Sequence, residues 1–384
     1  MSSSSSAPES LSSSPASSVP PTFTTTTATT THNGTVNVSR PKVLFIGDYS
    51  GCDDVDEEIR KVAEVHTLPR TGYEETAELI RKKVEVEGEF VAFGGLFLVS
   101  HNFPPKWDIG LLGPLAPSCK LYVGPGAGYD KVDIDWLSST GAMYANSPTA
   151  VGQRTADGAL MLTLAAMRGV TPQDLSVRAG KWRDLSVRTV DWRTAQIGII
   201  GLGSIGTRLA TLLTSIGATK ISYNSRRPSP TAQPSWTYYQ SLDELFATSD
   251  VIILTCPLTP ATHGMIGKEA FGKMKDGVVL VNVSRGQVVV ESELVDALES
   301  GKVRRAALDV FENEPEVHPG LLKNPNVTLS PHVAPAPDTM GQSMNGEVIE
   351  NILEFLKTGM PLTPVNLDQL EKNGFLVGKQ TVAQ

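Results

Sequence analysis

Short apolar runs alternate with longer stretches of helical spacing through most of the chain. The first half holds four runs with the length and composition of buried strands, at residues 42–47, 90–93, 120–123 and 143–145. The second half repeats the pattern with runs at 196–200, 220–223, 251–254, 278–281, 306–308 and 327–329. Because apolar runs and helical stretches alternate, the pattern predicts an α/β fold with two parallel sheets.

The helical stretches between and after these runs predict where the domains divide. Residues 151–168 have apolar positions at helical spacing and few charges, which predicts a long buried helix leaving the first domain. Residues 171–194 are polar and predict an irregular arm. A last helix near 338–357 could pack back onto the first domain, which would then be discontinuous. The predicted domains are 41–150 with 333–367, and 151–332.

Composition and charge argue against several classes of protein. Residues 1–40 are rich in Ser and Thr and predict a disordered tail, and residues 368–384 predict a second tail. The net charge of −8 argues against nucleic acid or an anionic membrane surface as a partner, and no apolar run is long enough to span a membrane. The three scattered cysteines suggest neither a disulfide framework nor a metal site. We therefore expect a cytoplasmic protein that acts on small molecules.

A glycine-rich turn follows the run at 196–200. Gly201, Gly203 and Gly206 have the G-x-G-x-x-G spacing between a strand and an amphipathic helix. In such a turn the glycines allow a tight bend and close approach of a pyrophosphate, while the helix start, with Ser204 and Ile205, offers free N–H groups. The motif predicts a Rossmann-type dinucleotide site, and the alternative is a structural glycine turn.

The next strand ends without the carboxylate that usually holds the ribose 2′-hydroxyl of NAD. The residues there are Asn224, Ser225, Arg226 and Arg227. Two arginines can bind a 2′-phosphate through charge-assisted hydrogen bonds. This predicts that NADP(H) is preferred and that NAD(H) remains possible. The alternative is a solvated pair of surface arginines.

Four polar residues follow the later strands of the second half. Arg285 follows one strand, Asp309 and Glu314 the next, and His332 the last. Ligands bind at this edge of open α/β sheets. An arginine suits a bidentate grip on a carboxylate, an imidazolium near neutral pKa suits proton donation, and a carboxylate such as Glu314 can orient it. Alternatively, Arg285 is a salt-bridged surface residue and His332 an ordinary hydrogen-bonded histidine at a domain seam.

Over about residues 41–367 the chain resembles the D-isomer-specific 2-hydroxyacid dehydrogenase family. The motifs that match are 201–206, 282–286, 308–315 and 330–332, in the family's order and spacing. The resemblance implies two Rossmann-like or flavodoxin-like domains, with substrate held mainly by the first. It also implies that Arg285 binds substrate, that His332 is the acid/base and that Glu314 supports it.

The resemblance extends to further residues. The loop 126–130 looks like the family loop whose amides bind the substrate carboxylate, which assigns Ala127 and Gly128 to that role. Thr155 matches a threonine beside the nicotinamide, Asp309 an aspartate near its carboxamide, and Cys256 with Pro257 the loop that passes the cofactor. The arm around Trp182 and Trp192 should help to form a homodimer, unless these tryptophans pack within one subunit.

Within the family, the arginine pair is most like NADP-linked glyoxylate and hydroxypyruvate reductases and related fungal 2-oxoacid reductases. We therefore expect NAD(P)H-dependent reduction of a small 2-oxoacid to the D-2-hydroxyacid. One alternative is a corepressor-like protein that senses NAD(P)H. Another is a dehydrogenase for a bulkier substrate such as mandelate, since Leu96, Phe97 and Trp107 bear on substrate size.

Overall fold

The computed structural model describes residues 28–30, 36–38, 40–47, 53–96, 106–335 and 340–376. The chain divides into two compact units, residues 1–40 and residues 41–384. In the first unit, β1 (Ala28–Thr30) pairs antiparallel with β2 (Val36–Val38). The segment predicted to be a disordered tail therefore contains one short pair of strands.

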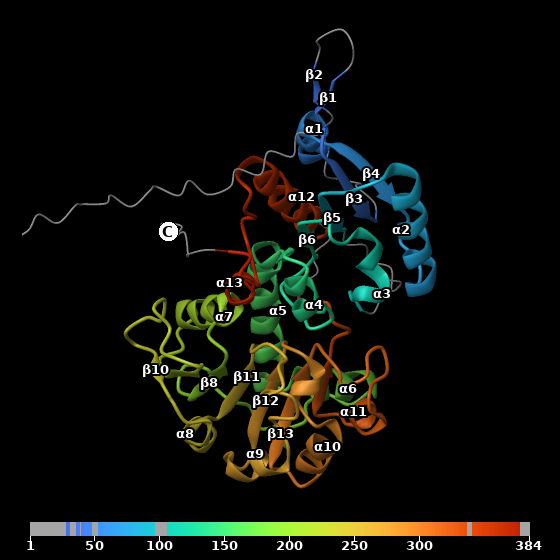
Figure 1. Ribbon diagram of the computed structural model, residues 1–384. Helices are drawn as coiled ribbons and strands as arrows, with labels where there is room; N and C mark the ends of the chain where they lie inside the picture. Colours follow the sequence, from blue (N-terminus) through green and yellow to red (C-terminus); the bar gives the residue numbers. More distant parts are fainter. Residues whose placement is uncertain are drawn as a thin grey trace, which may run out of the picture. The chain divides into compact units, whose positions relative to one another are not determined.

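The first domain of the second unit is built on a five-stranded parallel sheet in the order β4-β3-β5-β6-β7 (Figure 1). Its strands are β3 (Lys42–Ile46), β4 (Glu64–Leu68), β5 (Ala92–Gly95), β6 (Leu121–Val123) and β7 (Met143–Ala145). This is the flavodoxin-like order 2-1-3-4-5. The sequence analysis misses β4, because this edge strand is mostly polar and only Leu68 in it is buried.

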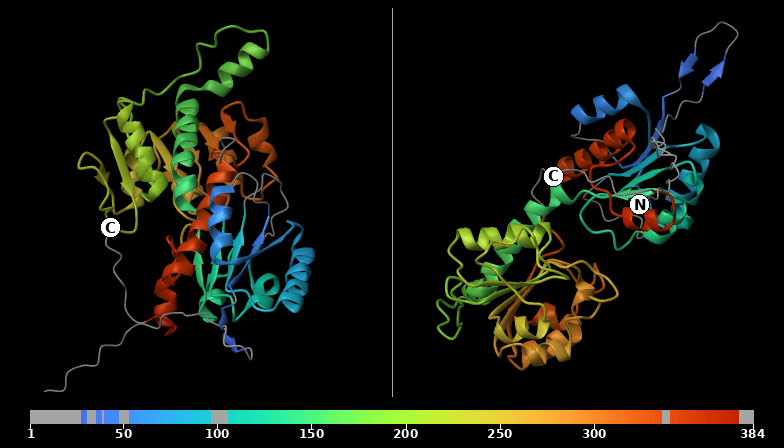
Figure 2. Two further views of the ribbon diagram at one scale, coloured as in Figure 1. Left: turned by 90° about the horizontal axis from the view of Figure 1, so that it is seen from above. Right: turned by 60° about the vertical axis from the view of Figure 1, so that its left-hand side comes forward.

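Helices cover both faces of this sheet, with one apolar cluster on each face. They are α1 (Asp53–Val62), α2 (Tyr73–Glu87), α3 (Ile109–Leu112), the 3-10 helix η1 (Gly113–Leu115) and α4 (Ile134–Ser139). From the other end of the chain, α12 (Met340–Thr358) packs beside α1, as both views in Figure 2 show. The first domain is therefore discontinuous, as predicted.

The ordered part of the chain extends further towards the C-terminus than the sequence predicts. Residues 367–372 form α13 (Leu367–Lys372), and Leu370 in this helix is fully buried in the apolar cluster of the first domain. Sequence alone gives little sign of this helix, because it is short and carries one buried position. Ordered packing therefore continues past the predicted boundary at residue 367.

The second domain is built on a seven-stranded parallel sheet in the order β10-β9-β8-β11-β12-β13-β14. Its strands are β8 (Ile197–Ile200), β9 (Ile221–Asn224), β10 (Thr237–Tyr238), β11 (Val251–Leu254), β12 (Val278–Asn282), β13 (Val303–Leu308) and β14 (Val327–Leu329). The order 3-2-1-4-5-6 with one added strand is that of a Rossmann fold, with a topological switch point between β8 and β11. The sequence analysis misses the two-residue β10.

Helices also cover both faces of this second sheet. On one face α5 (Pro148–Arg168) packs against α7 (Ser204–Ser215) and the strands, and on the other lie α8 (Leu242–Thr248), α9 (Lys268–Lys273) and α10 (Glu291–Glu299). The short elements are η2 (Gly286–Val288) and α11 (Pro319–Lys323). The long buried helix predicted from residue 151 begins three residues earlier, where Pro148 suits the first helical turn.

The predicted irregular arm, residues 171–194, is partly helical. Its first part forms α6 (Val170–Arg178), which has no buried residue. Helical spacing is hard to recognise there because no apolar stripe faces a core within the chain. The two tryptophans differ: Trp192 packs against the core and donates to the carbonyl of Ile216 at 3.1 Å, whereas Trp182 is 79% exposed.

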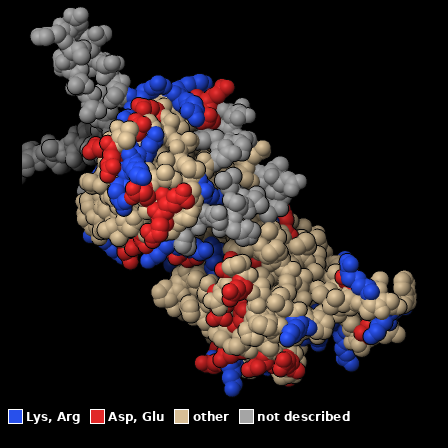
Figure 3. All heavy atoms as spheres, turned by 90° about the vertical axis from the view of Figure 1, so that its right-hand side faces the viewer, with Lys and Arg blue, Asp and Glu red and all other residues tan. Residues whose placement is uncertain are grey.

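Charge and hydropathy over the described residues give two further observations. On the face in Figure 3, Lys and Arg side chains are interspersed with Asp and Glu, and the described part of this face has no extended area of one sign. Among the described helices, none combines the length and the apolar character that a membrane crossing requires.

Candidate active site

Six of the residues singled out in the second domain lie at or just after the end of a strand. Gly201 follows β8, Asn224 closes β9, Cys256 follows β11, Arg285 follows β12, Asp309 follows β13 and His332 follows β14. Since every strand of the sheet is parallel to its neighbours, these residues share one edge of the sheet.

The dinucleotide loop has the close contacts that require its glycines. Gly201 has a φ of +96°, and a Cβ atom there would lie 2.7 Å from the backbone of Cys256 in the loop after β11. A Cβ on Gly206 would clash with the carbonyl of Gly201. A Cβ on Gly203 would meet nothing within 4 Å, so this position faces open space at the start of α7. That space and the N–H groups of Ser204 and Ile205 fit a pyrophosphate.

The start of α5 lies beside this loop. A Cβ on Gly152 would lie 3.6 Å from Oγ of Ser204. One turn later, Thr155 is 7% exposed and donates through Oγ1 to the carbonyl of Val151 at 2.8 Å. Across the switch point, Cys256 is 7% exposed and Pro257 is exposed. The first turn of α5 and Cys256 therefore lie against the loop from two sides, and the contacts of Thr155 and Cys256 with the cofactor stay predictions.

The loop after β9 presents two exposed arginines. Asn224 donates through Nδ2 to the carbonyls of Tyr239 and Gln240 at 2.9 and 3.1 Å, and Ser225 donates through Oγ to the carbonyl of Arg227 at 2.7 Å. Both Arg226 and Arg227 are exposed, and within the described ranges neither has a recorded ion-pair partner. The side chains of Asn224 and Ser225 thus shape the loop. The guanidinium groups of Arg226 and Arg227 stay available to bind an anion.

His332 and Glu314 form a direct contact. Nδ1 of His332 lies 2.9 Å from Oε2 of Glu314, and the other carboxylate oxygen accepts the N–H of Phe311 at 3.1 Å. Partial burial raises the pKa of Glu314, but the hydrogen bond and charge of His332 outweigh this, and the pKa lies below its ordinary value. An ionised carboxylate on Nδ1 holds the imidazole ring and leaves Nε2 for another partner.

The loop that carries His332 is held by Asp309. Its backbone carbonyl accepts the N–H of His332 at 2.7 Å, and its carboxylate accepts from Oγ of Ser330 at 2.6 Å and from the N–H groups of Val333 and Ala334 at 2.9–3.0 Å. His332 needs this support because its φ of +57° lies in the left-handed region. Burial raises the pKa of Asp309 above its ordinary value, although these donors act in the opposite direction.

This arrangement gives Asp309 a second role beside the expected one. The resemblance places its side chain near the nicotinamide carboxamide, and both carboxylate oxygens also accept hydrogen bonds from the histidine loop. Asp309 therefore positions His332, and its contact with the carboxamide stays a prediction.

Arg285 reaches from the second domain to a loop of the first. Its Nε donates to Oδ1 of Asp130 at 2.8 Å, and its Nη1 donates to the carbonyl of Ser284 at 2.7 Å. Nη2 lies against Gly128, where a Cβ atom would clash with it. Two of the five N–H groups thus have acceptors, and one N–H of Nη1 and both of Nη2 stay available for the expected grip on a carboxylate.

The loop under this guanidinium exposes backbone donors. It runs from β6 towards α4 and includes Gly126, whose φ is +85°. For the N–H groups of Ala127 and Gly128 the described part of the chain contains no recorded acceptor. The two amides and Nη2 of Arg285 are therefore close enough in the fold to bind one anionic group together.

Comparison with known proteins agrees with this geometry. The profile of the D-isomer-specific 2-hydroxyacid dehydrogenase NAD-binding domain matches residues 160–334. The 4-methyl-2-oxopentanoate reductase A of Aspergillus oryzae is 35% identical over 326 residues, which cover 85% of this chain and 98% of the reductase. The chain belongs to the D-isomer-specific 2-hydroxyacid dehydrogenase family.

Two solved structures extend the comparison to both domains of the dehydrogenase. The glyoxylate reductase from Paecilomyes thermophila has a TM-score of 0.77 and 34% identity, covering 85% of this chain and 98% of the reductase. The holo form of D-mandelate dehydrogenase from Rhodotorula graminis has a TM-score of 0.77 and 30% identity, with the same coverage. The protein is therefore an oxidoreductase with a nicotinamide-dinucleotide domain, which favours the enzyme over the cofactor-sensing binding protein.

Two site residues of the dehydrogenase escape the sequence analysis. Asp130 lies in the matched loop 126–130, yet only the fold shows that it contacts Arg285, which is 155 residues away. Asn282 is 1% exposed; it accepts from Ser284 and donates through Nδ2 to the carbonyl of Arg285 at 2.9 Å. The signal for Asn282 is its place in the arginine motif, where a polar residue ends an otherwise apolar strand.

Proposed function

We propose that this dehydrogenase uses NADPH to reduce a small 2-oxoacid, with glyoxylate and hydroxypyruvate as first candidates, to the D-2-hydroxyacid. The contact of 2.9 Å between His332 and Glu314 is the observation that carries the proposal. With Nδ1 engaged, Nε2 of His332 donates a proton to the carbonyl oxygen of the substrate. Glu314 holds the ring in the orientation from which Nε2 faces the substrate.

The substrate carboxylate binds at the opposite side of the reacting carbon. Nη2 of Arg285 and the N–H groups of Ala127 and Gly128 are the donors for it. These donors hold the carboxylate and so fix the direction of the neighbouring ketone, whose carbon receives the hydride.

The bound cofactor supplies the hydride. The open space at Gly203 and the start of α7 fit its pyrophosphate, and the backbone of Cys256 lies against Gly201 across the switch point. We propose that Cys256, Pro257 and Thr155 of α5 contact the rest of the cofactor. Asn224 and Ser225 shape the loop that bears Arg226 and Arg227. Since these arginines are exposed and no carboxylate repels a 2′-phosphate, we propose that NADPH is preferred over NADH.

A steady-state assay tests the proposed function. Consumption of NADPH is followed with glyoxylate, hydroxypyruvate and 4-methyl-2-oxopentanoate, and the product is checked for the D configuration. The variant His332→Ala should lower kcat by roughly a hundredfold or more, because it loses the proton donor. His318→Ala is the control, since this ring accepts the N–H of Gly320 at the start of α11. Full activity in His332→Ala would contradict the proposal.

A bulkier substrate is the second candidate, and the similarity to D-mandelate dehydrogenase favours including it. Of the residues named from sequence for substrate size, Leu96 and Trp107 are 0% and 2% exposed, and Phe97 lies outside the described residues. Tyr129, which follows Gly128, is 41% exposed. A panel that includes phenylglyoxylate separates the two candidates by kcat/KM.

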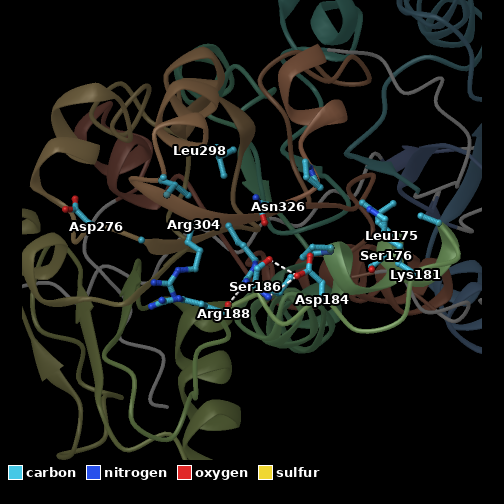
Figure 4. A pocket seen from close by; sticks show the side chains of 18 residues that line it. Leu175, Ser176, Lys181, Asp184, Ser186, Arg188, Asp276, Leu298, Arg304 and Asn326 are labelled. Atoms are coloured by element: carbon cyan, nitrogen blue, oxygen red, sulfur yellow. Dashed lines mark hydrogen bonds between the residues drawn. The ribbon is translucent and has the colours of Figure 1, made fainter.

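We also propose that two copies pair through the arm. Six of the large apolar side chains that are exposed in the chain gather between residues 161 and 185: Met161, Val170, Leu175, Val177, Trp182 and Leu185. In Figure 4 the arm residues Leu175, Ser176 and Lys181 line a pocket together with Arg304 and Asn326 at the edge of the sheet. Exposed apolar side chains on the arm and just before it, beside an open pocket, favour an isologous interface with a second copy.

Light scattering after gel filtration tests this pairing. Leu185→Asp, at a position that is 83% exposed, should convert the dimer to a monomer, because it places a charge in the apolar contact. Leu322→Asp is the matched control, since Leu322 is 60% exposed on α11. A wild-type monomer would contradict the proposal.

A further inference from the structure

Asn146 lies between β7 and α5, at the point where the chain leaves the first domain. The residue is 7% exposed, and its side-chain Nδ2 donates to the backbone carbonyl of Ala127 at 2.8 Å. The next residue acts on the same loop, since the N–H of Ser147 donates to the carbonyl of Gly126 at 2.9 Å. Two successive carbonyls of the loop are therefore bound by Asn146 and Ser147.

These two hydrogen bonds set the direction of the N–H groups of Ala127 and Gly128. Neither peptide bond of the segment 126–128 is among the cis bonds, and in a trans peptide the N–H points opposite to the carbonyl before it. With the carbonyls of Gly126 and Ala127 turned towards the start of α5, the N–H groups of Ala127 and Gly128 point the other way. These are the two amides without a recorded acceptor in the described residues.

Asn146 is itself held by the end of the chain. Its backbone carbonyl accepts from Oγ1 of Thr363 at 2.6 Å and from Nδ2 of Asn351 at 3.5 Å, and Asn351 is fully buried on α12. A second residue of α12, Glu347, accepts the N–H of Ala150 at 2.7 Å in the first turn of α5. The connection is therefore anchored on the side away from the loop, so Asn146 can act as a rigid support.

We propose that Asn146 is a positioning residue for substrate, which aims the amides of Ala127 and Gly128 at the carboxylate of the 2-oxoacid. It does not touch the substrate, and it acts by fixing the peptide plane between these two residues. This inference rests on the proposed function, in which those amides bind the carboxylate. The inference adds a residue outside the loop 126–130. It also explains why the buried side-chain amide of Asn146 lies where the two domains connect.

The test compares three variants of the full-length chain. Asn146→Ala removes the donor, and Asn146→Asp keeps the shape but cannot donate to a carbonyl when ionised. Asn366→Ala is the matched control: Asn366 is also a buried asparagine beside β7, with hydrogen bonds to Tyr144, Ser138 and Ala142 and none to the loop. For each variant we would measure Tm, Kd for NADPH by fluorescence, kcat and KM for the preferred 2-oxoacid, and Kd for oxamate in the presence of NADPH.

We expect Asn146→Ala to raise KM and the oxamate Kd by about tenfold, the size of one hydrogen bond. Its kcat and its Kd for NADPH should stay within about twofold, because proton donor and cofactor loop are unchanged. Asn146→Asp should raise both constants further, because its charge faces a carbonyl. Asn366→Ala should lower Tm but leave both constants unchanged.

Two results would overturn the inference. One is an unchanged KM and oxamate Kd in both variants of Asn146. The other is an equal rise in Asn366→Ala, which would mean that any loss of a buried asparagine loosens the site. A wild-type chain that reduces no 2-oxoacid would refute the proposed function, and oxamate binding would then still decide the role of Asn146.

Discussion

Replacing Glu314 by glutamine tests whether the negative charge of this carboxylate supports His332 in the reaction. The change keeps the size of the side chain and removes its charge, 2.9 Å from Nδ1 of the imidazole. A hydrogen bond between charged groups stabilises by about 1.5–3 kcal/mol and a neutral one by about 0.5–1.5 kcal/mol. The two side chains are 44% and 33% exposed, so water screens the pair and the low end of the difference applies.

A loss of about 1 kcal/mol corresponds to about a fivefold change in rate. At neutral pH the reduction rate of Glu314→Gln should therefore fall by about fivefold. Since the contact with His332 holds the pKa of Glu314 below its ordinary value, the wild-type carboxylate keeps its charge until the pH falls below the ordinary range of a glutamate. Protonation of Glu314 there removes from the wild type the charge that the variant lacks, so the ratio of the two rates should approach one as the pH falls.

The assay is the pH profile of NADPH-dependent reduction for wild type, Glu314→Gln and Glu316→Gln. Glu316 is an exposed glutamate two residues further on, without a recorded contact to His332 in the described structure, and its variant should follow the wild-type profile. Two results refute the reasoning: a rate of Glu314→Gln that stays below the wild-type rate by the same factor at acidic pH, or a profile that coincides with that of the wild type.

Three further predictions concern cofactor choice, the substrate loop and the cysteines. Replacing Arg226 and Arg227 by serine should lower kcat/KM for NADPH by at least about tenfold and leave that for NADH unchanged; an equal loss for both cofactors would contradict the proposed 2′-phosphate contact. Gly128→Ala should abolish 2-oxoacid binding but keep NADPH binding, because its Cβ would clash with the guanidinium of the substrate arginine. Burial raises the pKa of Cys256 to about 11 and that of Cys119 to about 12, so peptide mapping after iodoacetamide treatment at neutral pH should find both unlabelled in the folded chain. Since the folded thiols keep their protons above the ordinary pKa of 9.0, the free energy of unfolding should fall as the pH rises from about 9 towards 11.

The strand β11 is predicted best, because it is buried along its whole length. The run at 251–254 agrees with it to the residue, and all four residues are buried. The runs at 143–145 and 327–329 also agree with β7 and β14, although these strands lie at the edges of their sheets. The other two edge strands escape because β4 is mostly polar with one buried residue and β10 has only two residues.

The arm shows a different limit of sequence reasoning. The helix α6 has no buried residue, so no core within this chain imposes an apolar stripe on its sequence. The proposed pairing of two copies would give its exposed Leu175 and Val177 an apolar partner. Helical periodicity is therefore a poor guide to a helix that faces no core within its own chain.

The side chains proposed for catalysis and the residues proposed to position them differ in how far sequence can indicate them. Arg285 and His332 stand out in the sequence because each follows a recognisable strand, and the strand ends of a parallel sheet are a known place for ligand binding. Asp130 and Asn146 act on residues 155 and 19 positions away, through contacts that exist only after the loops have met.

The position of Arg285 shows why both kinds of residue are needed. Its guanidinium would have many orientations on a loop, but Asp130 binds Nε and the carbonyl of Ser284 binds Nη1, so Nη2 is directed at Gly128. The amides of that loop are in turn directed by carbonyls that Asn146 and Ser147 hold from behind. The donors proposed for one carboxylate thus come from two domains, and each is fixed by a partner that never contacts the substrate. Preorganisation of this kind lowers the entropic cost of binding a small substrate, which has few atoms of its own with which to order a site.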